Sequence, residues 1–195
     1  AVHCVTDAIK DEAAQYGLST ETTVVIHPAV DPQIFSQKLQ EKSSSELFHI
    51  VSVGNLLWMK GLEYALIAIK TLIAKGVSVS YKIIGSGEAY QHLLYTIHDF
   101  GVENAVQLMG RLSTTQVLAE LHKADAFLLS SLSEGLSNAV LEAMSCGLPV
   151  VSTDCGGMAE AITDGLEGFL VPVRNPDAVA TALYKLAIDP GLRVE

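Results

Sequence analysis

Two glutamates and one lysine are the side chains best suited to bind a ligand that carries both hydroxyl groups and an anion. Glu134 and Glu142 flank the start of an expected helix, and Lys60 follows a separate expected strand. A carboxylate accepts hydrogen bonds from hydroxyls more strongly than a neutral group does. A lysine beside a helix N-terminus can hold an anion such as a phosphate. Each of the three could equally be an ordinary surface charge, so their spacing alone leaves both interpretations open.

The backbone around Glu134 adds to this candidate site. Gly135, Leu136 and Asn138 lead into the helix that contains Glu142, so their amides could face the same anion. At about 100° per residue, Glu142 can face back toward the cleft while the residues before it turn toward the core. The segment therefore predicts two carboxylates at different depths beside one helix N-terminus.

Two glycine turns follow other expected strands. Loop 54–61 starts with Gly54 and Asn55 and contains Lys60, and its glycine lets the backbone approach a ligand closely. The turn that starts at Gly85 resembles the dinucleotide fingerprint G-x-G-x-x-G, but Tyr90 stands where the third glycine should be. We expect this turn to line the cleft, and a dinucleotide-binding oxidoreductase domain is kept as an alternative.

These loops must be positioned by elements that alternate along most of the chain. Expected helices separate strands of apolar residues at 49–54, 79–84, 105–109, 126–130, 150–153 and 169–171. Strands that are apolar on both faces indicate a parallel sheet covered by helices on each side. A closed eight-stranded barrel needs about 250 residues. The sequence therefore predicts an α/β fold with an open doubly wound parallel sheet, whose ligands bind beyond the carboxyl ends of the strands.

Helix boundaries can be read from capping residues. Residues 113–116 form a capping box, and Ser137 or Asn138 is expected to cap the next helix. The glycine turn at 155–157 is expected to lead into a helix that ends near Gly165. Asn175 followed by a proline predicts the start of the last helix.

The first fifth of the chain differs from the rest. A strand fragment and an amphipathic helix occupy residues 1–19, residues 24–32 contain two prolines, and residues 37–46 are a polar stretch expected to be an exposed connector. The chain is therefore expected to begin partway through a larger structure.

Charge and composition limit the partners. Twelve Lys and Arg against 22 Asp and Glu give a net charge of −10, with no basic cluster, so neither nucleic acid nor an anionic membrane is expected as a partner. No apolar run reaches the roughly 18 residues of a membrane span. The three cysteines form no C-x-x-C pair and the six histidines are scattered, so we expect reduced thiols, a cytoplasmic location and no metal site.

Residues 129–171, LSSLSEGLSNAVLEAMSCGLPVVSTDCGGMAEAITDGLEGFLV, closely resemble the signature region of retaining glycosyltransferase family 4, the glycosyl transferases group 1. Two glutamates with the family's spacing match Glu134 and Glu142. Further resemblances are VGNLLWMKG at 53–61, IIGSG at 83–87, VQLMGRL at 106–112 and HPAVDPQIF at 27–35. Together they cover nearly the whole chain.

The resemblance implies a Rossmann-like domain that forms the C-terminal half of a GT-B fold. Residues 1–35 would be the end of the N-terminal domain and the hinge, and residues 36–195 the nucleotide-sugar donor domain. The implied reaction is retaining, metal-independent transfer of a sugar from a nucleotide-diphosphate sugar. No cofactor is expected. The acceptor, a sugar, glycan or lipid-linked molecule, would be bound by the missing N-terminal domain.

The resemblance also implies roles for single residues. Lys60 would hold the donor diphosphate, Glu134 the hydroxyls of the transferred sugar, and Glu142 the ribose; Lys60 and Glu134 would be the catalytic pair. The remaining donor-binding residues would be Gly54, Asn55, Gly85, Arg111, Leu112, Gly135, Leu136 and Asn138, with Arg111 and Leu112 beside the base.

One departure from the family concerns the diphosphate. Asn55 stands where the family usually has an arginine, which leaves one cation fewer for the leaving group. This keeps a second alternative open, a non-catalytic module that binds nucleotide sugars. A sugar-nucleotide epimerase of the same architecture is a further alternative by fold analogy alone.

Overall fold

The main body of the protein is a six-stranded parallel sheet. The computed structural model describes residues 1–37 and 47–193. The strands are β3 (Phe48–Val53), β4 (Val79–Ile84), β5 (Val106–Gly110), β6 (Ala126–Leu129), β7 (Val150–Thr153) and β8 (Gly168–Val171). Their order in the sheet is β5-β4-β3-β6-β7-β8, and every neighbouring pair is parallel. The prediction of an open doubly wound sheet is confirmed.

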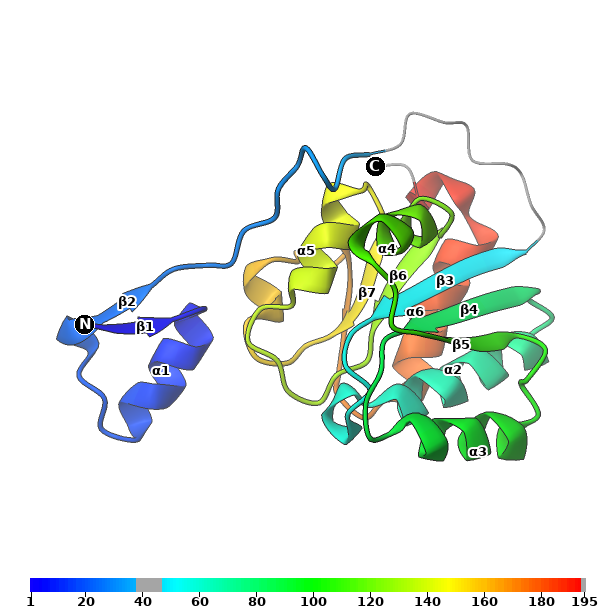
Figure 1. The fold of residues 1–195 in the computed structure, drawn as a ribbon, viewed down its shortest axis with the longest axis horizontal. Coiled ribbons are helices and arrows are strands. Elements are labelled where there is room, and N and C mark those ends of the chain that lie inside the picture. Colours follow the sequence, from blue (N-terminus) through cyan, green and yellow to red (C-terminus); the bar gives the residue numbers. More distant parts are fainter. Residues whose placement is uncertain (38–46, 194–195) are drawn as a thin grey trace.

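Helices cover both faces of this sheet (Figure 1). One face carries α2 (Leu62–Ala74), α3 (Tyr90–Phe100) and α6 (Pro176–Ile188), and the other carries α4 (Thr114–Leu121) and α5 (Asn138–Ser145). Side chains alternate along each strand, so neighbouring residues enter different cores. Ile50 and Leu128 belong to the core beneath α2 and α6, while Val51 and Phe127 belong to the core beneath α4 and α5.

Two of the capping predictions are confirmed, and the third is confirmed in position but not in its side-chain hydrogen bond. Ser113 and Gln116 form the expected capping box at α4, and the Asn175 side chain accepts a hydrogen bond from the Ala178 amide at 3.0 Å at the start of α6. Ser137 is the residue before α5, but neither it nor Asn138 caps the helix with its side chain. In the part of the chain that the structure describes, the first amides of α5 therefore have no side-chain acceptor.

The helix expected between 157 and Gly165 is absent. In its place is one 3₁₀ turn, Met158–Glu160. Met158 and Ile162 are buried as the apolar pattern requires. The chain then reverses at once: the Thr163 amide donates to the Glu167 carboxylate at 2.8 Å, which closes a turn that leads into β8. A helix cannot continue through a segment that must turn back to the sheet within a few residues.

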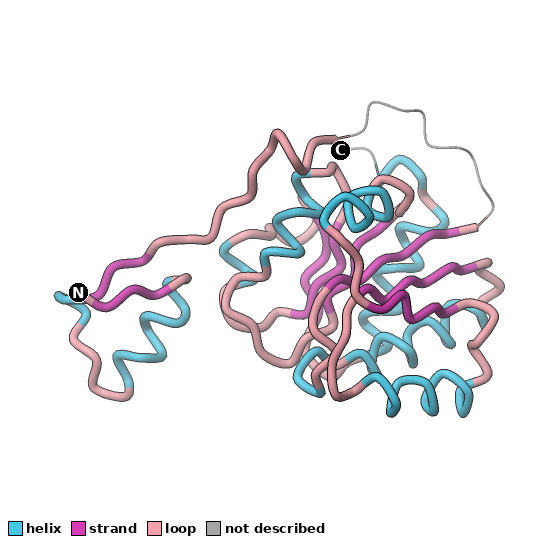
Figure 2. The backbone as a smooth tube through the Cα atoms, viewed as in Figure 1, coloured by secondary structure: helices cyan, strands magenta, loops and turns pink. Residues whose placement is uncertain are grey.

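A small N-terminal unit lies beside the main sheet (Figures 1 and 2). It consists of β1 (Val2–Cys4), α1 (Asp7–Gln15) and β2 (Thr23–Val25), and its two strands pair in parallel. A segment without helix or strand, shown as a pink tube in Figure 2, follows β2, and Phe35 at its end packs into the core beneath α5. The expected polar connector falls, after residue 37, outside the residues that the structure describes.

Candidate functional site

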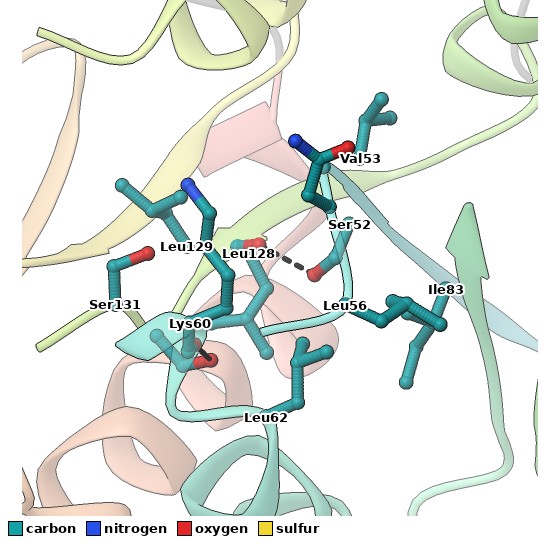
Figure 3. A pocket seen from close by; sticks show the side chains of 12 residues that line it. Ser52, Val53, Leu56, Lys60, Leu62, Ile83, Leu128, Leu129 and Ser131 are labelled. Carbon is teal, nitrogen blue, oxygen red and sulfur yellow. Dashed lines mark hydrogen bonds between the residues drawn. The ribbon is translucent and has the colours of Figure 1, made fainter. Parts of the chain in front are cut away.

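The candidate site lies where the connections of the sheet change direction. From β3 the chain continues through β4 and β5 on one side, while β6, β7 and β8 extend the sheet on the other. Open α/β sheets bind ligands at the carboxyl ends of the strands at such a switch point. A small, partly open hollow is found there, lined mostly by residues of β3, β6 and the loops that follow them (Figure 3). Gly54, Asn55 and Lys60 are among its lining residues.

Lys60 and Glu134 meet beside this hollow. The Lys60 ammonium lies 2.5 Å from Glu134 Oε1, and both side chains are mostly buried, at 22% and 12% exposed. The same oxygen accepts a hydrogen bond from the Ser131 hydroxyl at 2.6 Å. Within the described residues, Glu134 Oε2 has no hydrogen-bond partner. The structure thus brings together two residues 74 positions apart that sequence reasoning placed in one site.

Backbone contacts fix the lysine loop against the end of β6. The Ser130 hydroxyl donates to the Lys60 carbonyl at 2.9 Å, and the Leu132 amide donates to the Met59 carbonyl at 2.7 Å. Gly61 has φ +56, and a Cβ there would overlap the Ser130 carbonyl. Only glycine fits this position without strain. The ammonium of Lys60 is therefore presented by a loop whose main chain is held from two sides.

The base of the hollow is a buried polar network. The Ser52 hydroxyl donates to the Leu128 carbonyl at 2.5 Å and lies 2.8 Å from the Tyr81 hydroxyl. Burial raises the pKa of Tyr81 far above its ordinary value, so the phenol remains neutral and can donate to Ser52. Thr153 Oγ1 donates to the Ser131 carbonyl at 2.6 Å and ties β7 to the Glu134 loop. These bonds connect β3, β4, β6 and β7 directly beneath the site.

Gly85 supports the site from behind and is not among the residues that line the hollow. A Cβ at Gly85 would overlap the Gly54 carbonyl, and one at Gly87 would overlap the Leu56 backbone. The Leu56 amide also donates to the Ser86 carbonyl at 2.9 Å. The Gly85 turn therefore packs against loop 54–56, and its expected contact with a donor stays a prediction.

Glu142 lies one turn inside α5, apart from the pair formed by Lys60 and Glu134. It is half-buried, and no described residue forms a hydrogen bond or ion pair with its carboxylate. Loss of solvent around it raises the pKa of Glu142 above the ordinary value. Burial and the nearby Glu142 charge raise the pKa of the Cys146 thiol to about 11. The expected convergence of Glu142 with the other two residues on one ligand stays a prediction.

The other predicted residues lie at the same edge of the sheet. Arg111 and Leu112 follow β5, two strands from β3; Arg111 is exposed and its guanidinium has no partner among the described residues. Leu136 packs on the core beneath α5, and Asn138 is exposed at the start of that helix. No described residue accepts a hydrogen bond from the backbone amides of Asn138 and Ala139, which leaves two donors at a helix N-terminus.

Sequence reasoning missed the residues that hold the site together. Ser131 orients Glu134, Ser130 holds the Lys60 loop, and Thr153 fixes Ser131. A signal was available for two of them, because the pair of serines ends a strand that is otherwise entirely apolar. No local pattern marked Thr153, whose partner is in a neighbouring strand.

Folding also brings together a group that the scattered histidines did not suggest. Asp7, His27 and Glu160 present one ligand atom each within 4.8 Å of one another, all on exposed residues. Both Glu160 oxygens already accept hydrogen bonds from the amides of Asp7 and Ala8, at 3.0 and 2.9 Å. The Glu160 carboxylate of this cluster is therefore already engaged by the start of α1. None of the helices in the described part of the chain is long and apolar enough to cross a membrane.

Known proteins share this sequence pattern and this fold. The chain is 34% identical to the amylovoran biosynthesis glycosyltransferase AmsK of Erwinia amylovora over 177 residues, which cover 88% of this chain and 43% of that protein. The crystal structure of Anabaena Alr3699/HepE in complex with UDP and glucose superposes with a TM-score of 0.88 at 21% identity, covering 98% of this chain and 54% of that one. The chain thus spans about half the length of such relatives.

A third comparison identifies which half it is. The crystal structure of the C-terminal domain of a glycosyl transferase group 1 family protein, LpcC of Francisella tularensis, matches 85% of this chain and 91% of its own length, with a TM-score of 0.75 at 21% identity. The fold is therefore the Rossmann-like C-terminal half of a GT-B fold. The family model described as Glycosyl transferases group 1 matches residues 33–195, and the chain belongs to this family.

Proposed function

We propose that this chain is the donor-binding half of a retaining glycosyltransferase that takes a sugar from a nucleotide-diphosphate sugar. The contact between Lys60 and Glu134 at the switch point carries the proposal. A cation and a carboxylate at the carboxyl-terminal edge of the sheet match the two parts of such a donor. The cation suits the diphosphate, and the carboxylate suits the hydroxyl-bearing sugar. HepE, which has this fold, is described in complex with UDP and glucose.

The chemistry follows from where charge develops. Breaking the bond between the anomeric carbon and the diphosphate places negative charge on the leaving phosphate. Lys60 and the unpaired amides of Asn138 and Ala139 would stabilise that charge without a metal ion. The acceptor oxygen forms the new bond to the anomeric carbon, and its proton passes to the leaving phosphate. The acceptor would be a sugar, glycan or lipid-linked molecule held by an N-terminal domain.

Glu134 would hold the transferred sugar. Its Oε2 is unengaged in the described part of the chain and can accept a hydroxyl, while Oε1 stays with Ser131. The diphosphate would replace Glu134 as the partner of the Lys60 ammonium. Glu142, further into α5 and without a hydrogen-bond partner among the described residues, would accept the ribose hydroxyls. Arg111 and Leu112 would border the base.

An N-terminal domain in the complete protein is supported by the small N-terminal unit. Its two strands form a sheet of their own, and Val2, Val24 and Ile26 are 41%, 48% and 57% exposed. A larger sheet packed on these apolar residues would bury them. The family match favours sugar transfer over the dinucleotide-binding oxidoreductase alternative.

Calorimetric titration of the 195-residue chain with UDP-, GDP- and ADP-sugars, and separately with NAD, tests this proposal. We expect one class of sugar nucleotide to bind. Lys60→Ala should weaken binding about 10- to 100-fold, because a charge-assisted hydrogen bond to the diphosphate is lost. Lys75→Ala, a change at the end of α2, is the matched control and should leave affinity unchanged. Binding of NAD alone would overturn the proposal. Affinity for a donor without turnover in the complete protein would favour the non-catalytic alternative that Asn55 suggests.

A further inference from the structure

The N-terminal unit is attached to the donor domain through the start of α1. Glu160, in the 3₁₀ turn after β7, directs its carboxylate at the first turn of that helix. Its Oε2 accepts from the Asp7 amide at 3.0 Å and its Oε1 from the Ala8 amide at 2.9 Å. A carboxylate is favoured there because the first amides of a helix lack partners and carry partial positive charge. Thr6 caps the next amide, that of Ile9, at 3.1 Å.

Close packing surrounds these bonds. Thr6 is fully buried, and a Cβ at Gly157 would overlap its side chain. A Cβ at Gly135 would lie 2.9 Å from the Val5 side chain and 3.2 Å from that of Ile9. The start of α1 therefore rests on two glycines, one from each of the loops that follow β6 and β7.

The same two loops hold Glu134. The Gly157 amide donates to the Gly135 carbonyl at 2.8 Å, and Gly135 directly follows Glu134. A Cβ at Gly156 would overlap the Glu134 carbonyl. A continuous series of contacts thus runs from Glu160 through the start of α1 and the glycines to the backbone of Glu134, whose side chain reaches Lys60.

We propose that Glu160 is a positioning residue for sugar transfer, which holds the N-terminal unit against the Glu134 loop and so sets the place of the Glu134 carboxylate relative to the donor. This inference rests on the proposed function. The residue touches neither the hollow nor Lys60, so it acts through the loop and not on the substrate. A displacement of about 1 Å of a catalytic group relative to the substrate can lower the reaction rate about 100-fold.

Amide hydrogen exchange on the 195-residue chain tests the contact directly. In Glu160→Ala the amides of Asp7 and Ala8 should exchange faster, and protection of the Gly157 amide, which donates to the Gly135 carbonyl, should fall with them. Glu160→Gln keeps one acceptor oxygen and should retain part of the protection. Glu167→Ala is the matched control, because Glu167 also accepts from a backbone amide in the same loop but, within the described residues, forms no hydrogen bond or ion pair with α1. Unchanged exchange at α1 in Glu160→Ala would overturn the proposal.

Steady-state kinetics of the complete protein test the consequence for the reaction. We expect kcat to fall about 10- to 100-fold in Glu160→Ala, with the dissociation constant of the donor within about twofold of the parent value, and to recover partly in Glu160→Gln. Loss of protection at α1 with unchanged kcat would reduce Glu160 to a structural contact and overturn the proposal. If the parent chain binds no sugar nucleotide, the proposed function itself fails. The exchange experiment needs no sugar nucleotide, so it still tests the contact of Glu160 with α1, and the two failures can be told apart.

Discussion

Two partly buried cation–carboxylate pairs stand at opposite ends of the central strands, and they are built differently. At the carboxyl end, the Lys60 ammonium contacts one oxygen of Glu134. At the amino end, Arg193 contacts Asp125 at 3.2 Å, and both side chains are as deeply buried, at 14% and 12% exposed.

The difference lies in how many hydrogen-bonding positions are used. Asp125 also accepts from the His49 amide at 2.8 Å, while Arg193 donates to the carbonyls of Leu186 and Ala187 at the end of α6 and stacks on Phe48. Lys60 donates to Glu134 alone among the described side chains, and the second oxygen of that carboxylate is unengaged. Only the pair of Lys60 with Glu134 can exchange partners without leaving several groups unsatisfied.

A buried ion pair stabilises a fold only when its remaining donors and acceptors are satisfied. By that criterion the pair of Arg193 with Asp125 is structural, and the pair of Lys60 with Glu134 can be opened by a ligand. Distance alone would have ranked the two in the opposite order of importance for stability, since the lysine pair is the shorter one.

The largest expected effect is on stability. Arg193→Ala should lower the free energy of unfolding by about 3 kcal/mol, because it leaves the Asp125 carboxylate without a counter-charge and removes the side-chain donor to two helix carbonyls. Lys60→Ala should cost about 1 kcal/mol or less, since Ser131 still donates to Glu134. Urea unfolding of the 195-residue chain measures both. Equal losses in the two variants would refute the distinction between the pairs.

A second cation beside Lys60 should increase the affinity for the donor and so widen the difference between the two ion pairs. Asn55 is exposed and lines the hollow beside Lys60. Asn55→Arg should raise donor affinity about 5-fold, or about 1 kcal/mol, because an added guanidinium can donate to the diphosphate. The gain should shrink with added salt. Titration with the donor at two salt concentrations measures this, and Asn55→Gln is the uncharged control. An unchanged affinity would show that the diphosphate does not reach residue 55.

The smallest expected effect concerns Glu142, whose carboxylate has no hydrogen-bond or ion-pair partner among residues 1–37 and 47–193. Desolvation raises its pKa in the folded protein, so the folded state holds this proton more tightly than the unfolded state. Its contribution to stability is therefore lost as pH rises from the ordinary glutamate pKa through the raised value. Glu142→Gln should have a higher Tm than the parent at pH 7 and the same Tm near pH 4, while binding the donor more weakly. Parallel Tm curves across this range would contradict the assignment.

The sheet could be predicted because its signal is local. Runs of apolar residues and caps such as Asn175 depend on neighbours a few positions away. For Lys60 and Glu134, the sequence could predict only that both lie at the same edge of the sheet, because parallel strands bring their carboxyl ends together. The contact itself depends on Ser130 and Gly61, which pack across a gap of about 70 residues.

The errors have a common physical origin. The helix expected after residue 157 fails because the turn at Thr163 and Glu167 is imposed by the position of β8. Glu160 escaped notice because its partners, the amides of Asp7 and Ala8, are about 150 positions away in the sequence. Local sequence patterns show apolar periodicity, but they do not show which distant side chain accepts hydrogen bonds from the first amides of a helix.

The glycines around the site have a practical consequence for protein engineering. At Gly61, Gly85 and Gly156 any larger residue would collide with main-chain carbonyls, which cannot move aside as side chains do. A mutant library intended to alter sugar or base preference should therefore leave these positions untouched. Diversity belongs instead at Asn55 and Asn138, whose exposed side chains can change while the surrounding scaffold keeps its shape.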